Sequence, residues 1–463
     1  MELLPGKAGP PPDAGLLRAP FQSILYLEGE CRAQQAPTEA PDYFHDINLD
    51  QIIEAVTNGR DEYALKPFFY DRLTTPEAIE YRHEVMRDLE NGAAIECVKC
   101  FAGEMRRMRE QIARANKLYY QYQKERWLLH AAETYCATVR GLRDRLSGLP
   151  LTSHGLLAFH DYLEAYAGSD RFTSLVAAVN DLTGGLDAIQ YSMIIKDGSF
   201  TVRKYESEQD YSLKVAETFR KFQQGAVKDY RVNFRPTVEM DHIEAKVLEF
   251  VTRLHPEVFS RLDAFCARYA NCADRVLVAF DREVQFYVAY LEYLTPLKVA
   301  GLAFCYPRVS AIDKNVRDDA EFDLALATKL LAQGQPTITN DLELRGKERI
   351  ILVSGPNQGG KTTFARTFGQ VHHLASIGCQ VPGTGAQLFL FDSMFTHFER
   401  QEDSTALHGK LEDDLLRIHD ILDRATSRSI IIMNEIFNST TLQDAVFLAQ
   451  KVIERVIALD ALC

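Results

Sequence analysis

A glycine-rich turn between an apolar run and a helical stretch constrains this chain more than any other feature. Residues 350–353 read Ile-Ile-Leu-Val, and they lead into Ser354-Gly-Pro-Asn-Gln-Gly-Gly-Lys-Thr-Thr363. The segment fits the phosphate-binding loop pattern, in which a glycine, four further residues and Gly-Lys-Thr follow a strand and open a helix. Glycines let backbone N–H groups wrap phosphates, and the helix N-terminus adds partial positive charge. The pattern therefore predicts a strand over Arg349–Ser354 and a phosphate site.

The loop also assigns roles to its residues. Lys361 is expected to reach the β- and γ-phosphates, and the Thr362 hydroxyl is expected to coordinate Mg²⁺. The residues predicted to hold the phosphates are Gly355, Pro356, Asn357, Gln358, Gly359, Gly360, Lys361, Thr362 and Thr363. A plain glycine turn is the alternative, although the full pattern is expected by chance in only about 2 in 100 such chains. Apolar residues then recur at helical spacing, and Gly378 is expected to end that helix.

A second acidic motif lies downstream of the loop. Residues 429–435 read Ser-Ile-Ile-Ile-Met-Asn-Glu, an apolar strand that ends in a carboxylate. In open α/β sheets such a strand ends beside the phosphate loop, which would place Glu435 to activate water. The preceding position usually carries the Asp that holds Mg²⁺, whereas this chain has Asn434. Because an amide brings no charge, the sequence predicts a weaker metal site.

Length and charge restrict the class of protein. The chain has 463 residues, enough for two or three domains, and its net charge of −13 excludes a generally basic nucleic-acid surface. No apolar run is long enough to span a bilayer, and Met1–Pro5 lacks the features of a signal peptide. The 9 cysteines are scattered without framework spacing, which favours a reducing cytoplasm.

Hydrophobic periodicity divides the chain into three parts. Residues 1–40 are rich in proline, alanine and glycine, and they predict a loosely ordered extension with one ordered piece at 21–27. Residues 41–310 are mostly helical and include a hairpin at 191–205, where Asp197-Gly198 separates two β-prone runs. Residues 311–463 change to α/β character around the phosphate loop.

One long helix is predicted over residues 95–150, and it carries a run of basic and aromatic side chains. They are Arg106, Arg107, Arg109, Arg114, Lys117, Lys124 and Arg126, with Tyr119, Tyr120, Tyr122 and Trp127. Such a stripe can bind nucleic acid. Glutamates at 104, 110 and 125 dilute its charge, so a solvated helix face is the favoured interpretation.

Several motifs together resemble the ATPase domain of MutS proteins. The Gly-Pro-Asn opening of the loop is specific to that family among phosphate-loop proteins. The other matching segments are Ala375-Ser-Ile-Gly-Cys-Gln-Val-Pro382, Asp392-Ser-Met-Phe-Thr396, Ala425-Thr426, Glu435-Ile436, Ser439-Thr-Thr441 and Asp444. The resemblance spans about residues 43–463 and is strongest after residue 336.

The resemblance implies a fold and an activity. It implies an all-α core and lever region followed by an ABC-type phosphate-loop ATPase domain, which uses ATP and Mg²⁺. It further implies a homodimer, joined through the ATPase domain, that clamps duplex or branched DNA in repair or recombination.

Departures from the family pattern change these expectations. The helical core begins near residue 43, and we find no counterpart of the aromatic-plus-glutamate wedge, so MutS-type mismatch reading is not expected. The family's signature serine, which acts across the dimer, falls on Gly409, with Ser404 considered as a substitute and Lys410 nearby. The family's further strand, histidine loop and dimerising helices have no counterpart before Cys463, which implies an incomplete ATPase domain.

Two other functions remain compatible with these residues. One is a nucleotide-gated scaffold that binds ATP, hydrolyses it poorly and acts through protein contacts; Asn434 and Gly409 favour it. The other is a general binder of DNA structures in recombination. ATP turnover separates the enzyme from the scaffold, and salt-dependent DNA binding separates the DNA functions from the scaffold.

Overall fold

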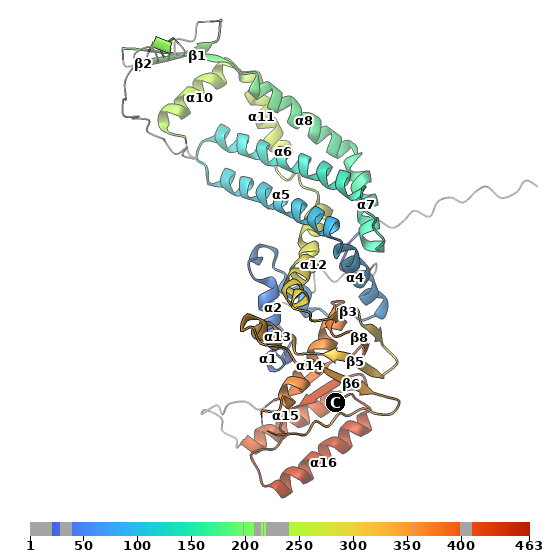
Figure 1. The fold of residues 1–463 in the computed structure, drawn as a ribbon. Coiled ribbons are helices and arrows are strands. Elements are labelled where there is room, and N and C mark those ends of the chain that lie inside the picture. The colour runs from blue at the N-terminus through green and yellow to red at the C-terminus, as the bar shows by residue number, and fades with distance from the viewer. Residues whose placement is uncertain are drawn as a thin grey trace, which may run out of the picture. The chain divides into compact units, whose positions relative to one another are not determined.

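The structure is a computed structural model, shown in Figure 1. It describes residues 21–27, 39–197, 199–207, 214–215, 217–218, 240–356, 358–398 and 410–463. The chain divides into two compact units. Unit 1 is formed by residues within 1–95, 150–162 and 282–463, and unit 2 by residues within 96–149 and 163–281. Among the helices of the described ranges, none is both long enough and apolar enough to cross a membrane.

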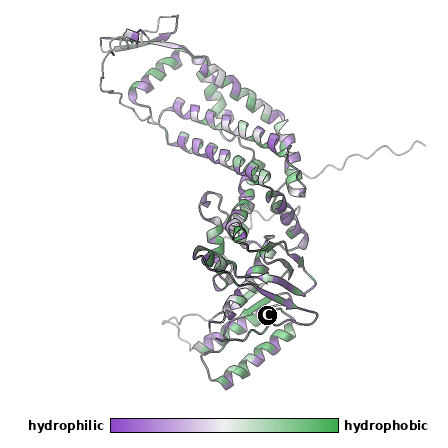
Figure 2. Cartoon of the chain, viewed as in Figure 1, coloured by the Kyte–Doolittle hydropathy of each residue, from purple (hydrophilic) through white to green (hydrophobic). Residues whose placement is uncertain are grey.

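Unit 2 is built from helices and one hairpin. Its helices are α6 (Gln121–Leu146), α8 (Asp170–Asp187), α10 (His242–Leu254) and α11 (Pro256–Arg268), with parts of α5 (Gly92–Lys117), α7 (His154–Ala167) and α12 (Arg275–Val299). Hydrophobic and hydrophilic residues alternate along α5 and α6, as expected for helices with one buried face (Figure 2).

The prediction of one continuous helix over residues 95–150 is wrong. Helix α5 ends at Lys117 and α6 begins at Gln121. The Leu118 N–H bonds back to the Ala115 carbonyl at 3.2 Å, which closes the last turn of α5. Tyr120 then has an extended backbone (φ −81°, ψ 127°) and caps α6. Since neither glycine nor proline occurs at this break, no local signal predicts it.

A hairpin lies where the Asp-Gly pair predicts one. Strands β1 (Tyr191–Lys196) and β2 (Ser199–Lys204) pair antiparallel, with Lys196 opposite Ser199. Asp197 has φ +50°, the left-handed conformation that such a tight turn requires. Phe200 packs against Phe250 of α10, with 6.1 Å between ring centroids, so one face of the hairpin is anchored on a helix.

Unit 1 combines short helices with small sheets. The helices that lie wholly in unit 1 before the phosphate loop are α1 (Tyr43–Asp46), α2 (Leu49–Thr57), the 3₁₀ turn Asp61–Tyr63, α3 (Lys66–Tyr70), α4 (Pro76–Leu89) and α13 (Leu324–Ala332). The remaining parts of α5, α7 and α12 also belong to this unit. A four-stranded sheet has the order β4-β8-β5-β6. Its strands are β4 (Arg308–Ser310), β8 (Gly385–Phe389), β5 (Val316–Glu321) and β6 (Asn340–Leu344), and β3 (Phe304–Cys305) pairs separately with β7 (Val381–Pro382).

A second, parallel layer carries the acidic motif. Strand β10 (Ile430–Met433) pairs parallel with β9 (Met394–His397) on one side and with Leu462 on the other. Cys463 in turn donates its N–H to the Arg349 carbonyl at 2.8 Å and accepts from the Ile351 N–H at 2.9 Å. The segment before the phosphate loop therefore lies beside residues 461–463, which lie beside β10.

The strand predicted over Arg349–Ser354 is not formed. The residues have no regular secondary structure, and within the described ranges their backbone partner across the layer is Cys463. Leu352 is 84% exposed and Val353 is 40% exposed. A strand needs a continuous ladder of inter-strand hydrogen bonds, and β-prone residues alone do not supply the neighbour.

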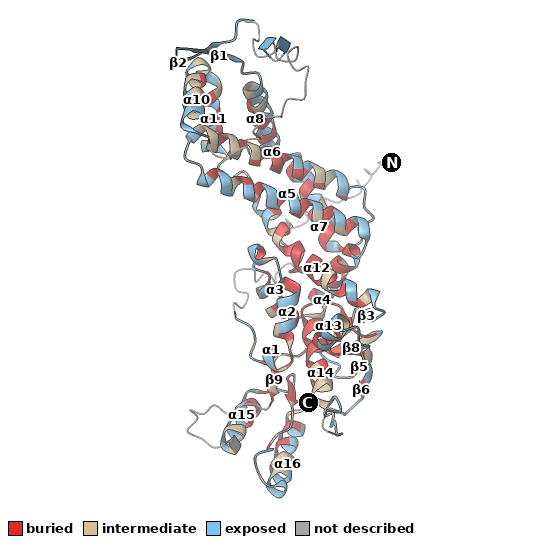
Figure 3. Ribbon diagram, turned by 60° about the vertical axis from the view of Figure 1, so that its left-hand side comes forward, coloured by how far each residue is buried: buried red, intermediate tan, exposed pale blue. Residues whose placement is uncertain are grey.

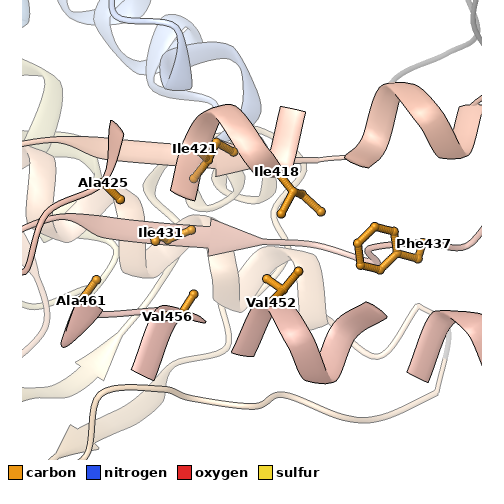
Figure 4. Close-up of a cluster of buried hydrophobic side chains, with 8 residues drawn as sticks. All are labelled: Ile418, Ile421, Ala425, Ile431, Phe437, Val452, Val456 and Ala461. Carbon is orange, nitrogen blue, oxygen red and sulfur yellow. The ribbon is translucent and has the colours of Figure 1, made fainter. Parts of the chain in front are cut away.

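Helices cover both faces of β10. Ile431 on β10 lies between Ile421 on α15 (Lys410–Arg424) and Val456 on α16 (Leu442–Leu459), as Figure 4 shows. Ile418, Ala425, Phe437, Val452 and Ala461 complete this cluster of buried side chains. This packing holds β10 between the two helices, and it therefore fixes the position of Asn434 and Glu435, which follow the strand.

Helix α14 (Lys361–Ser376) is enclosed over its second half. All residues from Thr367 to Ser376 are buried, and Figure 3 shows α14 surrounded by other elements of unit 1. Gly378 follows the C-cap Ile377 with φ +71°, as predicted for a glycine that ends a helix. The helix that begins at the phosphate loop therefore runs through the core of unit 1.

Candidate nucleotide-binding site

The geometry of the loop explains why glycine occupies positions 359 and 360. Gly360 caps α14 with φ +85°, a left-handed conformation that other residues rarely adopt. A Cβ on Gly359 would lie 3.0 Å from the Pro356 carbonyl oxygen, so a side chain there would push the turn open. The turn thus brings backbone close to itself and delivers Lys361 as the first helical residue.

Two side chains at the start of α14 face the end of β10. The Lys361 Nζ donates to the Gly355 carbonyl at 2.9 Å and lies 4.0 Å from the Glu435 Oε1. The Thr362 hydroxyl donates to the Asn434 Oδ1 at 3.0 Å. Asn434 is held in turn by its own N–H, which donates to the His397 carbonyl at the end of β9 at 2.8 Å. The two sequence motifs therefore meet in space.

Glu435 occupies a strained turn. Its φ is +53°, and Phe437 two residues later has φ +61°. Such backbone conformations in residues other than glycine persist only where the surroundings hold them, and they concentrate at functional sites. Phe437 is buried in the cluster around β10, and the Asn438 amide donates to the Glu435 Oε2 at 3.2 Å. Both contacts hold the turn that aims the carboxylate.

These residues fit a nucleotide phosphate with a divalent cation, although the cation ligands carry little charge. The α14 N-terminus, Lys361 and the glycine turn supply donors for phosphate oxygens. A hydroxyl and an amide oxygen at Thr362 and Asn434 are oxygen ligands of the kind that Mg²⁺ accepts. The charge that a carboxylate at position 434 would bring is absent from this pair.

Several predicted site residues fall outside the part of the chain that is described. They are Asn357, Ser404 and Gly409, while Lys410 begins α15 without a described side chain. The role of the segment around Ser404, Gly409 and Lys410 across a dimer therefore stays a prediction.

Sequence reasoning missed a polar seam along α14. The Arg366 Nε donates to the Asp46 carbonyl at 3.0 Å, and the Gln370 Nε2 donates to the Ile47 carbonyl at 2.8 Å. His373 is bonded to the Tyr43 hydroxyl at 3.0 Å and to the Phe69 carbonyl at 2.9 Å, and burial lowers its pKa to about 3. The available signal was the helical spacing of these polar residues, which the apolar residues of the same helix obscure.

This seam ties the phosphate-loop helix to α1, to its C-cap Ile47 and to α3. Each of its three side chains bonds a main-chain carbonyl of residues 46, 47 or 69. The helix that would sense phosphate at one end is thus attached to the helical core along its length.

The basic stripe of α5 and α6 is largely engaged within unit 2. Arg107 lies 3.6 Å from Glu104, and Arg126 lies 3.0 Å from Glu133. Arg109 pairs with the buried carboxylate of Asp281. Arg114 lies over the Trp127 ring at 5.5 Å from its centroid. These contacts engage several of the basic side chains within unit 2; the solvated helix face that the sequence favoured stays a prediction.

Comparison with known proteins matches the region that contains the candidate site. A family model described as MutS domain V matches residues 351–462, a stretch that includes the loop helix and the end of β10. Over these residues the chain belongs to the MutS domain V family. The match begins inside the apolar run before the loop and ends at Leu462.

MutS proteins from bacteria and a MutS homologue from yeast are similar over parts of the chain. DNA mismatch repair protein MutS of Shouchella clausii is 36% identical over 117 residues, which are 25% of this chain and 13% of that protein. The MutS of Carboxydothermus hydrogenoformans is 28% identical over 222 residues, 47% of this chain and 25% of the relative. DNA mismatch repair protein MSH3 of Yarrowia lipolytica is 27% identical over 215 residues, 43% of this chain and 21% of the relative. The chain thus covers at most a quarter of the length of these relatives.

Proposed function

We propose that the chain binds ATP with Mg²⁺ at the loop 355–363, hydrolyses it with the help of Glu435 and couples the nucleotide state to the clamping of DNA. The observation that carries the proposal is the 3.0 Å contact between the Thr362 hydroxyl and the Asn434 amide. It joins the phosphate-loop helix to the end of the acidic strand, as a nucleotide-hydrolysis site requires.

Each residue has a distinct task in this proposal. Lys361 pairs with the β- and γ-phosphates, and the glycine turn with the α14 N-terminus supplies backbone donors to their oxygens. Thr362 and Asn434 hold Mg²⁺, which neutralises phosphate charge when bound. Glu435 orients the attacking water and accepts its proton. Because phosphoryl transfer depends on positioning and electrostatics, the strained turn at Glu435 contributes by fixing that carboxylate.

The wider function rests on the family and on the attachment of α14. The polar seam along α14 supports transmission of nucleotide state to the helical core, which in this proposal clamps duplex or branched DNA in repair or recombination. We include no MutS-type mismatch reading, because the sequence shows no aromatic-plus-glutamate wedge. The proposal includes a cytoplasmic homodimer through the ATPase domain, in which Ser404, Gly409 or Lys410 of one subunit faces the other's γ-phosphate.

Substitution of Lys361 tests the nucleotide site. Lys361→Ala should abolish ATP binding, measured by titration calorimetry, because it removes the cation that pairs with the phosphates. Lys347→Ala is the matched control, since Lys347 lies on an exposed turn in the same region. If Lys361→Ala binds ATP as tightly as the control, the site is not a phosphate loop.

A nucleotide-gated scaffold is the second candidate function. The neutral Asn434 favours it, as does the Glu435 carboxylate, which already bonds Asn438. Turnover decides between the two. Glu435→Gln should reduce ATP hydrolysis strongly in an enzyme, whereas a scaffold would show the same low rate before and after the change. DNA binding that weakens with rising salt would support the DNA role of either form.

A further inference from the structure

A short N-terminal segment is bound in unit 1 in the way a protein binds a peptide. Residues Phe21–Leu27 have no regular secondary structure, yet Ile24 and Leu25 are 0% exposed and Ser23 and Tyr26 only 3%. A helix or strand would satisfy its backbone groups by itself or through a ladder. In this segment the Leu25 and Tyr26 N–H groups donate to the Ser23 hydroxyl, and side chains of α4 and α12 bond the other backbone groups described below.

The backbone is bonded at successive positions. The Tyr81 hydroxyl donates to the Ser23 carbonyl at 2.8 Å, and the Tyr287 hydroxyl donates to the Ile24 carbonyl at 2.6 Å. The Ile24 N–H donates to the Glu283 Oε2 at 2.9 Å. Main-chain hydrogen bonds with separate pockets for side chains are the usual mode of binding an extended peptide.

Aromatic rings anchor the two ends of the segment. The Phe21 ring meets that of Phe159 on α7, with centroids 5.4 Å apart. The Tyr26 hydroxyl donates to the Asp71 carboxylate at 3.3 Å. The segment is therefore held by its side chains near both ends and by backbone hydrogen bonds between them.

Arg82 on α4 joins this segment to the nucleotide helix. Its side chain is fully buried; the Nε donates to the Leu25 carbonyl and the Nη1 to the Ile377 carbonyl, both at 2.8 Å. Ile377 is the C-cap of α14. A single guanidinium therefore connects the bound segment with the end of the helix that begins at the phosphate loop.

Because Arg82 is charged and buried, the bound segment and the C-terminal end of α14 depend on each other. If the segment left, Arg82 would lose the Leu25 carbonyl as an acceptor, and Glu283 would lose the Ile24 N–H. A buried charge without its partners is strongly unfavourable, so the surrounding helices would have to rearrange. Burial raises the pKa of Glu283 to about 7, and the hydrogen bond from the Ile24 N–H opposes that rise.

We propose that residues 21–27 act as a captive peptide ligand of unit 1 and that Arg82 couples the binding of this segment to the nucleotide helix. The segment and the nucleotide then stabilise each other's binding, because coupling between two sites is reciprocal. The nucleotide part of this inference rests on the proposed function, whereas the binding of the segment does not.

A cleavable full-length chain tests the binding of the segment. A protease site inserted after Cys31 allows the folded chain to be cut, and release of the N-terminal fragment is followed by gel filtration. We expect the fragment to stay bound after the cut. Tyr287→Phe should speed its release about fivefold, the effect of one lost hydrogen bond. Tyr290→Phe is the matched control, because it is equally buried on α12 but bonds the Gln380 carbonyl at 2.7 Å. Immediate release, or equal release rates for the two variants, would overturn the proposal.

Hydrogen exchange and nucleotide affinity test the coupling. After the fragment has been displaced with excess synthetic peptide 21–27 and the peptide removed, exchange of the amides of residues 377–379 should accelerate. ATP affinity should fall about fivefold or more, in the usual range of allosteric coupling. If neither form binds ATP, the proposed function fails and the exchange experiment alone decides the coupling. Unchanged exchange at 377–379 after removal of the segment would overturn it.

Discussion

Gly378→Ala should destabilise unit 1 at the junction between α14 and α4. Gly378 has φ +71°, and an added Cβ would lie 2.7 Å from the Arg82 Cβ and 3.0 Å from its Cδ. The left-handed conformation costs alanine about 1–2 kcal/mol. Overpacking adds about 1–3 kcal/mol, because Arg82 is fully buried and fixed at both nitrogens that bond Leu25 and Ile377. We therefore expect a loss of about 2–5 kcal/mol.

Gly334→Ala separates the two contributions. Gly334 has a similar φ of +65°, but nothing in the described part of the chain lies within 4 Å of an added Cβ, so only the conformational cost applies. Urea denaturation followed by circular dichroism should show Gly334→Ala losing about 1–2 kcal/mol, and Gly378→Ala clearly more. If the two variants lose the same stability, Arg82 does not pack closely against Gly378 at the end of α14, and the reasoning is wrong.

Three further predictions concern metal, pH and DNA. Asn434→Asp should tighten Mg²⁺-dependent ATP binding by restoring a charged ligand; an unchanged ratio of ATP affinities with and without Mg²⁺ would count against the site. Because burial raises the pKa of Glu283 to about 7, above about 4.3 in the unfolded chain, protonation favours the fold. The stability that this protonation contributes is complete below about pH 4 and is lost as pH rises through 7, by up to about 3 kcal/mol. Glu283→Gln should remove this pH dependence from the free energy of unfolding measured between about pH 5 and 8. Parallel stability profiles for the two proteins would refute the prediction. Neutralising Arg106, Arg107 and Lys117 together should flatten the salt dependence of DNA binding by about one unit per lost phosphate contact if α5 touches DNA; an unaltered slope would leave it an ion-paired face.

Local sequence determined the elements whose geometry depends on neighbouring residues only. The Gly-Lys-Thr ending opens α14 at Lys361, and Gly378 follows its last turn with the positive φ that favours glycine. Asp197, the first residue of the Asp-Gly pair, follows β1 with a positive φ. Dihedral restrictions act within one or two residues, so they can be applied without knowing the fold.

Only the tertiary structure decided the features that need a distant partner. The apolar run before the loop forms no strand, because within the described ranges its neighbour is the single residue Cys463. Arg82 reads as an ordinary surface arginine until Leu25 and Ile377, which are far apart in the chain, provide its acceptors. The contact of Thr362 with Asn434 likewise joins residues that the sequence separates widely. Hydrogen bonds across such separations depend on packing of the whole unit, and periodicity within a segment carries no information about them.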